Sequence, residues 1–327
     1  MNELLNWAVL GAGGIADEMA AALAAQGRRF YAVTSRRAAG AQAFAARWQV
    51  AQIYESTEAL LADPAVQAVY IATPHNLHAG QIMAALKAGK HVLCEKAIAL
   101  NSRELAAAFE LANQKGLVLA EAMTIWHMPL YQELWGLVGN GPLGRVQLLQ
   151  VNFGSYKEYN MANRYFDAAF AGGMLLDIGV YALSLARSFM EAAPGTVHST
   201  LRFAPSGVDE QAALLLANEA GQMATLTLSL HSKLPKRAVI SCEKGYIEID
   251  DYPRAQSALV VEAATGAKRV VEAGSTSGAL AYEIAAVEQA AATGDVAPLC
   301  QGFTQDVMDV MTGLRKEWGL CYPGEAW

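Results

Sequence analysis

The stretch "GGMLLDIGVY" carries an acid and a phenol in otherwise apolar surroundings. Asp177 and Tyr181 are four residues apart, about one turn of an α-helix, so we expect both side chains on one face of a helix. An acid and a phenol are also groups that can bind and deprotonate an alcohol. On these two residues alone, a helix-terminal carboxylate beside a half-buried tyrosine is the simpler interpretation. A catalytic role for the pair therefore needs support from other parts of the sequence.

A second candidate for chemistry is the glycine-rich sequence "VLGAGGIAD", which ends an apolar run near the start of the chain. Gly11, Gly13 and Ala16 match the G-x-G-x-x-A pattern of dinucleotide-binding loops. In that pattern the first glycine permits a tight turn, and the second lets the backbone approach a pyrophosphate at a helix N-terminus. We therefore expect Gly11, Gly13, Gly14 and Ile15 to bind a dinucleotide.

The end of the next apolar run, "AVTSRR", indicates which dinucleotide binds. An NAD site carries Asp or Glu about 20 residues after the glycines to bind the ribose 2′-hydroxyl, and no acid stands there. Ser35, Arg36 and Arg37 take its place, and arginine binds a 2′-phosphate through charge-assisted, often bidentate hydrogen bonds. Two cations at a helix N-terminus oppose the helix dipole, so a bound phosphate explains them better than a solvated helix start. We predict NADP(H), with NAD less favoured.

The composition limits the classes of protein that can carry these residues. The chain has 327 residues, enough for two domains, and 54% hydrophobic and 17% charged residues indicate a globular fold. With 24 Lys and Arg against 31 Asp and Glu, the net charge of −7 argues against nucleic acid as the main partner. We see no apolar run of about 18 residues, no signal peptide and no paired cysteines. We therefore expect a cytoplasmic protein that does not enter a membrane.

Two halves of the chain differ in periodicity. Up to residue 121, apolar runs alternate with helical stretches, the pattern of a doubly wound parallel sheet covered by helices on both faces. After residue 122, many strand-like runs follow one another through glycine-containing turns, the pattern of a large, mainly antiparallel sheet. We predict an α/β chain with an NADP-binding Rossmann domain at 1–121 and an α+β domain with an open sheet at 122–327.

Several motifs together carry a family resemblance. With the segments "VYIATPHNLHAG", "CEKA" and "GGMLLDIGVY", the loop "GAGGIA" resembles the glucose-fructose oxidoreductase/inositol dehydrogenase/MocA family. The resemblance extends over nearly the whole chain. It implies a Rossmann domain followed by a substrate domain whose open sheet often makes dimer contacts. We therefore expect a homodimer or a higher homo-oligomer.

The resemblance also implies a catalytic lysine. In the family, a strand ending in Glu-Lys-Pro brings its lysine to the nicotinamide, and Glu95 and Lys96 match this motif. Ala97 replaces the proline. A cis peptide bond before a residue other than proline costs about 3 kcal/mol, so we expect a trans bond between Lys96 and Ala97.

The segment "ATPHNLH" lies beside the cofactor in this family. The resemblance therefore implies that Thr73, Pro74, Asn76 and His78 line the cofactor site. His75 and His78 lack an acidic third ligand nearby, so we expect no metal site.

A tyrosine four residues after the aspartate resembles the branch of dihydrodiol dehydrogenases and NADP-linked aldose dehydrogenases, in which a lysine and a tyrosine act as a pair. A free tyrosine has a pKa of about 10, and a neighbouring ammonium favours the phenolate, which can take a proton from an alcohol. We assign Tyr181 as the general acid/base and Lys96 as its electrostatic partner. Asp177 would bind a neighbouring substrate hydroxyl or orient Lys96.

Three other polar residues are candidates for substrate binding. His127, in "IWHMP", faces the nicotinamide pocket or packs in the core. Asn163 and Arg164, in "MANRYFD", precede the catalytic helix, where Arg164 anchors substrate or cofactor or forms a surface ion pair.

These residues predict an NADP-dependent oxidoreductase that acts on a small polyhydroxylated molecule. An aldose, an inositol-like ring and a trans-dihydrodiol all fit. The alternative is a non-catalytic NADP-binding sensor on the same fold, for which Ala97 is the best support.

Overall fold

The computed structural model describes residues 4–325, which form two compact units. The first unit consists of residues 4–123 and 277–301, and the second of residues 124–276 and 302–325. The boundary between the units falls after residue 123, whereas the sequence predicted it after residue 121. The sequence assigned residues 277–301 to the second domain, whereas the structure packs them with the first unit.

A buried carboxylate ties this segment to the first unit. Helix α9 (Ala279–Thr293) carries Glu288, which accepts hydrogen bonds from Trp7 Nε1 at 3.0 Å and from Arg28 Nη1 at 3.1 Å. Glu288 is 7% exposed, and a buried carboxylate is stable only with such partners. Trp7 and Arg28 are 281 and 260 residues away in the chain, so local sequence patterns could not show the contact.

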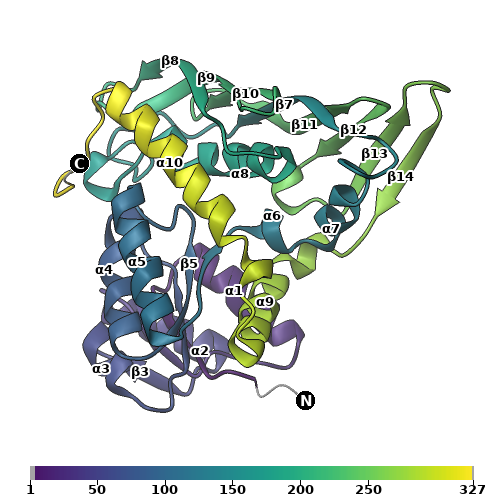
Figure 1. Cartoon of the computed structure of the whole chain (residues 1–327). Helices are drawn as coiled ribbons and strands as arrows, with labels where there is room; N and C mark the ends of the chain where they lie inside the picture. Colours follow the sequence, from purple (N-terminus) through teal and green to yellow (C-terminus); the bar gives the residue numbers. More distant parts are fainter. Residues whose placement is uncertain (1–3, 326–327) are drawn as a thin grey trace. The chain divides into compact units, whose positions relative to one another are not determined.

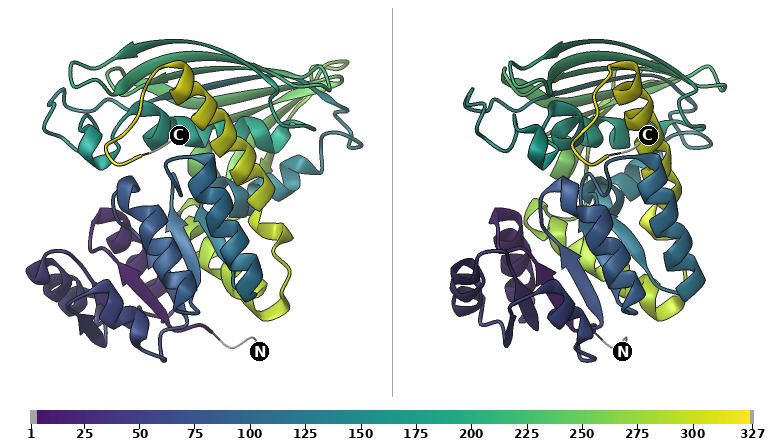
Figure 2. Two further views of the ribbon diagram at one scale, coloured as in Figure 1. Left: turned by 60° about the vertical axis from the view of Figure 1, so that its left-hand side comes forward. Right: turned by 90° about the vertical axis from the view of Figure 1, so that its left-hand side faces the viewer.

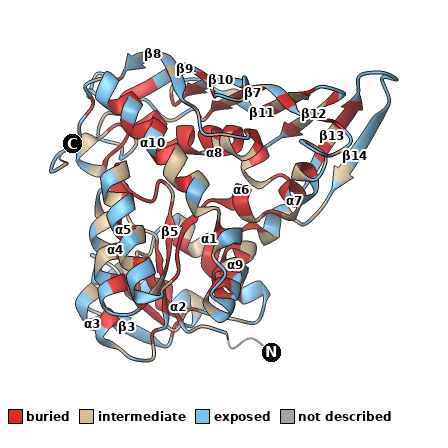
Figure 3. Ribbon diagram, in the orientation of Figure 1, coloured by how far each residue is buried: buried red, intermediate tan, exposed pale blue. Residues whose placement is uncertain are grey.

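Six parallel strands form the sheet of the first unit, in the order β3-β2-β1-β4-β5-β6. Their bounds are β1 Trp7–Leu10, β2 Ala32–Thr34, β3 Gln52–Tyr54, β4 Ala68–Ile71, β5 His91–Glu95 and β6 Leu119–Ala122. Every residue of the central strands β1 and β4 is buried, and β5 is largely so (Figure 3). The strand order reverses between β1 and β4, as in the doubly wound Rossmann arrangement. The predicted fold class of this half is confirmed.

Helices cover both faces of this sheet (Figure 1). Helix α1 packs against α2 and α9, and α4 packs against α5. The helices are α1 Gly14–Ala25, α2 Ala38–Trp48, α3 Thr57–Ala62, α4 His75–Lys87 and α5 Ser102–Lys115. Asn101 caps α5 by accepting from Glu104 N at 3.0 Å, and Gly116 ends it with φ 63°. The apolar pattern of the sequence did not indicate β3 and α3, and β3 has only three residues, two of which are exposed.

Eight strands form the sheet of the second unit, in the order β14-β13-β12-β11-β7-β10-β9-β8 (Figure 2). Their bounds are β7 Val146–Gly154, β8 Thr196–Phe203, β9 Asp209–Ala217, β10 Met223–Ser229, β11 Leu234–Cys242, β12 Gly245–Asp250, β13 Ser257–Glu262 and β14 Lys268–Glu272. Neighbouring strands are antiparallel except β7 and β10, which are parallel. The prediction of a large, mainly antiparallel sheet is confirmed.

Burial alternates along β9 and β10, so this sheet has one covered and one exposed face. Helix α8 (Val180–Phe189) packs on the covered face against β7 and β10. A five-residue π-helix, Leu175–Gly179, leads into α8. The other helices of this unit are α6 Thr124–His127, α7 Pro129–Trp135 and α10 Gln301–Glu317.

One helical stretch is long and apolar enough to cross a membrane, although the sequence analysis saw no run of that length. Ala168–Phe189 has a mean hydropathy of 1.6 over its most apolar part, and 72% of that part is buried inside the protein. It contains α8, so its apolar residues form the core beneath the sheet.

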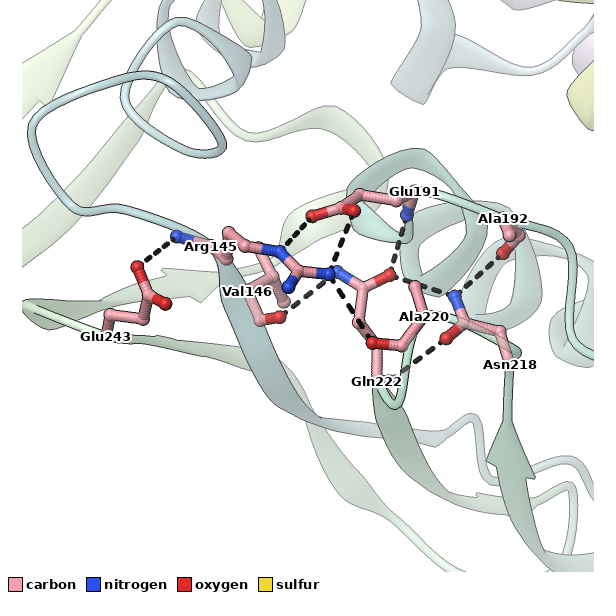
Figure 4. A network of polar contacts seen from close by, with 8 residues as sticks. All are labelled: Arg145, Val146, Glu191, Ala192, Asn218, Ala220, Gln222 and Glu243. Atoms are coloured by element: carbon pink, nitrogen blue, oxygen red, sulfur yellow. Dashed lines mark hydrogen bonds and ion pairs between the residues drawn. The ribbon is translucent and has the colours of Figure 1, made fainter.

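A polar network holds the turn between β9 and β10 to the start of β7 (Figure 4). Gln222 Nε2 donates to Val146 O at 3.1 Å, and Gln222 Oε1 accepts from Glu191 N at 2.7 Å. Asn218 Nδ2 donates to the same oxygen at 2.9 Å, and Arg145 pairs with Glu191 at 2.9 Å. These side chains fix one end of the sheet and take no part in the candidate site.

Candidate active site

A groove of about 600 Å³ lies in the first unit, where β1, β2 and β4 end. Seven of the expected cofactor residues line it: Gly11, Gly13, Ser35, Arg36, Arg37, Thr73 and Pro74. The groove lies where the strand order reverses, which is the usual ligand crevice of an open α/β sheet. The structure thus brings together residues from three separate turns.

The two glycines of the loop have different surroundings. Gly11 has φ +103°, and a Cβ there would lie 2.5 Å from Ala72 O, so the protein itself requires glycine. At Gly13 a Cβ would meet nothing within 4 Å. Gly13 is exposed and precedes α1, so its backbone borders open space at a helix N-terminus. This cradle fits a pyrophosphate.

The end of the groove beside β2 is basic. Arg36 and Arg37 are exposed, and within residues 4–325 neither forms an ion pair. Arg37 occupies the N-cap position of α2, and its side chain does not cap the helix. The two cations therefore have no partner within the unit that explains their placement, and they fit a 2′-phosphate.

The groove has nine further lining residues that the sequence did not indicate, and three of them, Glu55, Ser56 and Thr57, come from the turn after β3 and the start of α3. Ser56 caps α3 by accepting from Ala59 N at 3.1 Å. A serine before a helical run is a typical N-cap, so Ser56 could have indicated the start of α3 from the sequence.

Six expected cofactor residues are not among those that line the groove: Gly14, Ile15, Asn76, His78, Glu95 and Lys96. Gly14 and Ile15 begin α1, and Asn76 is exposed in the first turn of α4. Glu95 is buried at the end of β5, where it accepts a hydrogen bond from the Tyr70 hydroxyl. Glu95 thus helps to fix the end of the strand that carries Lys96.

The expectation of a trans bond between Lys96 and Ala97 is wrong, because this bond is cis. His75 Nε2 lies 3.2 Å from Lys96 O, and His78 Nδ1 lies 2.9 Å from Ala97 O. Both carbonyls of the turn therefore have a histidine partner that the sequence did not reveal. Lys96 itself is half-buried.

His78 does not line the cofactor groove as expected. Its side chain is fully buried, and its second ring nitrogen, Nε2, lies 2.8 Å from Thr73 O. Burial lowers the pKa of His78, and a neutral imidazole can donate to only one of its two carbonyl neighbours. His78 therefore holds the turns of Thr73 and Ala97 together.

Asp177 and Tyr181 lie in one continuous helical segment, but not in a regular α-helix. Asp177 is in the π-helix, and Tyr181 is in the first turn of α8. π-Helical insertions are rare and are frequent at functional sites. Asp177 is 9% exposed and Tyr181 is half-buried.

The second unit also holds an aromatic contact to Tyr181 and a buried histidine nitrogen. The ring centroid of Phe153 lies 5.9 Å from that of Tyr181 and 6.0 Å from that of Tyr252. His127 Nε2 is buried without a hydrogen-bond partner in the described part of the chain, and burial lowers the pKa of His127 to about 4. A neutral His127 can exchange a hydrogen bond with a bound molecule.

Asn163 and Arg164 shape their own loop. Asn163 Oδ1 accepts from Tyr165 N at 3.3 Å, and the Arg164 guanidinium lies 4.2 Å from the centroid of the Tyr165 ring. Arg164 also donates to the Tyr165 hydroxyl at 3.0 Å and is exposed. Arg164 forms no ion pair among the described residues, and binding of substrate or cofactor by its exposed side chain stays a prediction.

Comparison with known proteins matches both halves of the chain to one family. Residues 5–123 match the family described as "Oxidoreductase family, NAD-binding Rossmann fold", and residues 131–248 match the "GFO/IDH/MocA C-terminal domain". The chain is 32% identical to trans-1,2-dihydrobenzene-1,2-diol dehydrogenase of Sus scrofa, over 79% of this chain and 78% of that protein.

Two further proteins are similar. The chain is 34% identical to an uncharacterized oxidoreductase, ORF334, of Rhizobium meliloti, over 69% of each chain. Its fold is similar to that of the 3-ketoreductase KijD10 from Actinomadura kijaniata, solved with NADP and TDP-benzene. The TM-score is 0.85 at 25% identity, covering 96% of this chain and 98% of that chain.

Proposed function

We propose a function from the premise that this chain belongs to the GFO/IDH/MocA oxidoreductase family, to which both of its halves match. It is an NADP(H)-dependent oxidoreductase that transfers a hydride between the nicotinamide and a CH–OH group of a polyhydroxylated small molecule. We propose an aldose, an inositol-like ring or a trans-dihydrodiol as the substrate class.

The observation that carries this proposal is the pair of arginines at the basic end of the groove. Arg36 and Arg37 line the groove beside Ser35, and no acid stands at the end of β2. This arrangement favours a 2′-phosphate over a free 2′-hydroxyl. The similar 3-ketoreductase was solved with NADP, which supports the same cofactor here.

Three residues of the chain have roles in the proton transfer that accompanies hydride transfer. The bound nicotinamide supplies a hydride acceptor or donor. Tyr181 takes the proton of the substrate hydroxyl during oxidation and returns it during reduction. The Lys96 ammonium stabilises the phenolate of Tyr181, and Asp177 accepts a hydrogen bond from a neighbouring substrate hydroxyl.

Absorbance of the reduced nicotinamide tests this function. Purified protein is mixed with NADP⁺ or NAD⁺ and a panel of aldoses, inositols and dihydrodiols. We expect NADPH to form with one substrate class. Binding of NADP⁺ without turnover on any member would instead favour a sensor. Turnover with NAD⁺ alone would show that Arg36 and Arg37 have another role.

We also propose a cytoplasmic homodimer formed through the exposed face of the eight-stranded sheet. Leu215 and Met223, on neighbouring strands of this face, are 44% and 48% exposed. Exposed apolar side chains on the open face of a sheet are a common basis for association. Light scattering would test the dimer, and a charged residue such as Asp at Leu215 should shift the mass toward a monomer.

A further inference from the structure

A lysine lies on the covered face of the second sheet, beside the ring of Phe153, which contacts Tyr181. Lys236 is in β11, two residues before the buried Ala238, so its side chain points to the same face. Its Nζ lies 5.2 Å from the centroid of the Phe153 ring. Phe153 is in turn the residue whose ring packs 5.9 Å from Tyr181.

No acid neutralises this lysine within hydrogen-bonding distance. Lys236 is half-buried, and in the described range 4–325 it forms no hydrogen bond and no ion pair. Of the charged groups that act on it, Asp251 is the one acid, whereas Lys157, Lys233 and Arg254 are cations. Burial and these cations lower the pKa of Lys236, and Asp251 opposes them.

The neighbouring loop adds positive charge and an aromatic surface. Lys157 Nζ lies 4.3 Å from the centroid of the Tyr165 ring, and Arg164 lies over the same ring. Lys157 and Lys233 form no side-chain ion pair within the described residues. Partial burial of a cation without a counter-ion costs free energy, and a bound anionic ligand would offset this cost. Lys157, Lys233 and Lys236 together also attract anionic ligands from solution.

We infer that this site takes a polyhydroxylated substrate that carries an anionic group, a carboxylate or a phosphate ester, held by Lys236 with the help of Lys157 and Lys233. The inference rests on the proposed function, since it places the substrate beside Tyr181. Lys236 is then a specificity-determining residue. It selects the substrate by charge, and Tyr181 carries out the proton transfer.

Three ligands with a similar sugar ring test the inference: glucose, glucuronate and glucose 6-phosphate. We expect kcat/KM with NADP⁺ to be at least tenfold higher for one of the anionic sugars than for glucose. Lys236→Met should lower that value at least tenfold and leave the value for glucose within twofold. Lys236→Arg should retain most of the preference, and the two anionic sugars distinguish a carboxylate from a phosphate.

Arg237→Met is the matched control. Arg237 is the next residue in β11, but it points to the opposite face, where it pairs with Glu248. The substitution removes the same charge, and we expect no change in the preference for the anionic sugar. Equal use of glucose and both anionic sugars would overturn the inference. An equal effect of Lys236→Met on neutral and anionic sugars would also overturn it.

Calorimetry separates this inference from the proposed function. The protein is loaded with NADPH, so that the alcohol substrates bind without reacting, and each sugar is titrated into it. Tighter binding of an anionic sugar that is lost in Lys236→Met supports the inference even where no sugar is oxidised. Binding that does not depend on the charge of the sugar, or the absence of binding, overturns it.

Discussion

The backbone amide of Leu175 donates a 2.6 Å hydrogen bond to Oδ2 of Asp209, 34 residues later in the chain. Asp209 is fully buried at the start of β9. A strand of the sheet therefore supplies the carboxylate that accepts a hydrogen bond from the first turn of the π-helix. Gly173, just before this turn, has φ +131°, and a Cβ there would lie 2.2 Å from Asp209 Oδ1. The start of the helix that carries Asp177 and Tyr181 is therefore fixed from outside that helix.

This contact predicts an unusual dependence of stability on pH. Burial raises the pKa of Asp209 to about 7, while the amide of Leu175 and the charge of Arg315 oppose the rise. A native state with a raised pKa binds more protons than the unfolded chain, so the free energy of unfolding falls as pH rises from about 4 to about 7. The loss is at most about 4 kcal/mol.

Asp209→Asn removes this titration while keeping the shape of the side chain. Relative to wild type, the variant should gain stability as pH rises from 4.5 to 7.5, measured by urea unfolding at several pH values. The same change at the exposed Asp309 should leave the pH profile unchanged. Parallel profiles for wild type and Asp209→Asn would show that Asp209 stays ionised in the native protein.

The glycine loop predicts two opposite phenotypes. Gly11→Ala should destabilise the first unit by about 1–3 kcal/mol, because its φ of +103° and the Ala72 carbonyl 2.5 Å away both exclude a Cβ. Gly13→Ala should leave stability within about 0.5 kcal/mol, since nothing lies within 4 Å. Its methyl group would occupy the space of the pyrophosphate, so we expect NADP⁺ affinity to fall at least tenfold.

Thermal unfolding without cofactor and NADPH fluorescence titration measure the two effects separately. Normal NADP⁺ affinity in a folded Gly13→Ala protein would place the pyrophosphate elsewhere. Equal stability of both variants would contradict the close approach of Gly11 to Ala72.

Local patterns in the sequence predicted most elements, and the misses have physical causes. Strands with continuous apolar runs and helices with clear caps, such as Asn101 before α5, were placed to within a few residues. Strand β3 is short and largely exposed, so it has no hydrophobic signature. The π-helix follows from tertiary contacts such as that of Asp209, which no local pattern encodes.

The sequence predicted the motifs of the candidate site, but it did not predict the residues that hold these motifs in place. The glycine loop and the basic end of strand β2 are recognisable because each lies in a short, continuous motif. The roles of His78 and Lys236 depend on which carbonyl or ring lies opposite them, and those neighbours are distant in the chain. Likewise, segment 277–301 belongs to the first unit because Glu288 contacts Trp7 and Arg28, which are distant in the chain.

Removing the two unpaired arginines should change the choice of cofactor. Arg36→Ala with Arg37→Ala should lower NADP⁺ affinity about 100-fold, because hydrogen bonds between charged groups contribute about 1.5–3 kcal/mol each. NAD⁺ affinity should change less than threefold. Arg29→Ala, which removes an exposed cation before β2, is the control. Calorimetric titration of both dinucleotides measures the ratio, and an equal loss for both would mean that the arginines do not contact the 2′-phosphate.

Replacing Tyr181 by Phe tests the catalytic assignment most directly. The ring and its contact with Phe153 remain, but the hydroxyl is lost. General acid–base catalysis contributes about 10²–10⁴-fold, so kcat should fall by about that factor, while NADPH affinity should stay within twofold. Tyr156→Phe removes a hydroxyl from an exposed tyrosine of the same unit and should keep full activity. Steady-state absorbance with the substrate found in the panel gives kcat, and fluorescence titration gives the affinity. Unchanged turnover in Tyr181→Phe would move the acid/base role to another residue, and His127, with its buried and unpaired Nε2, would be the first to examine.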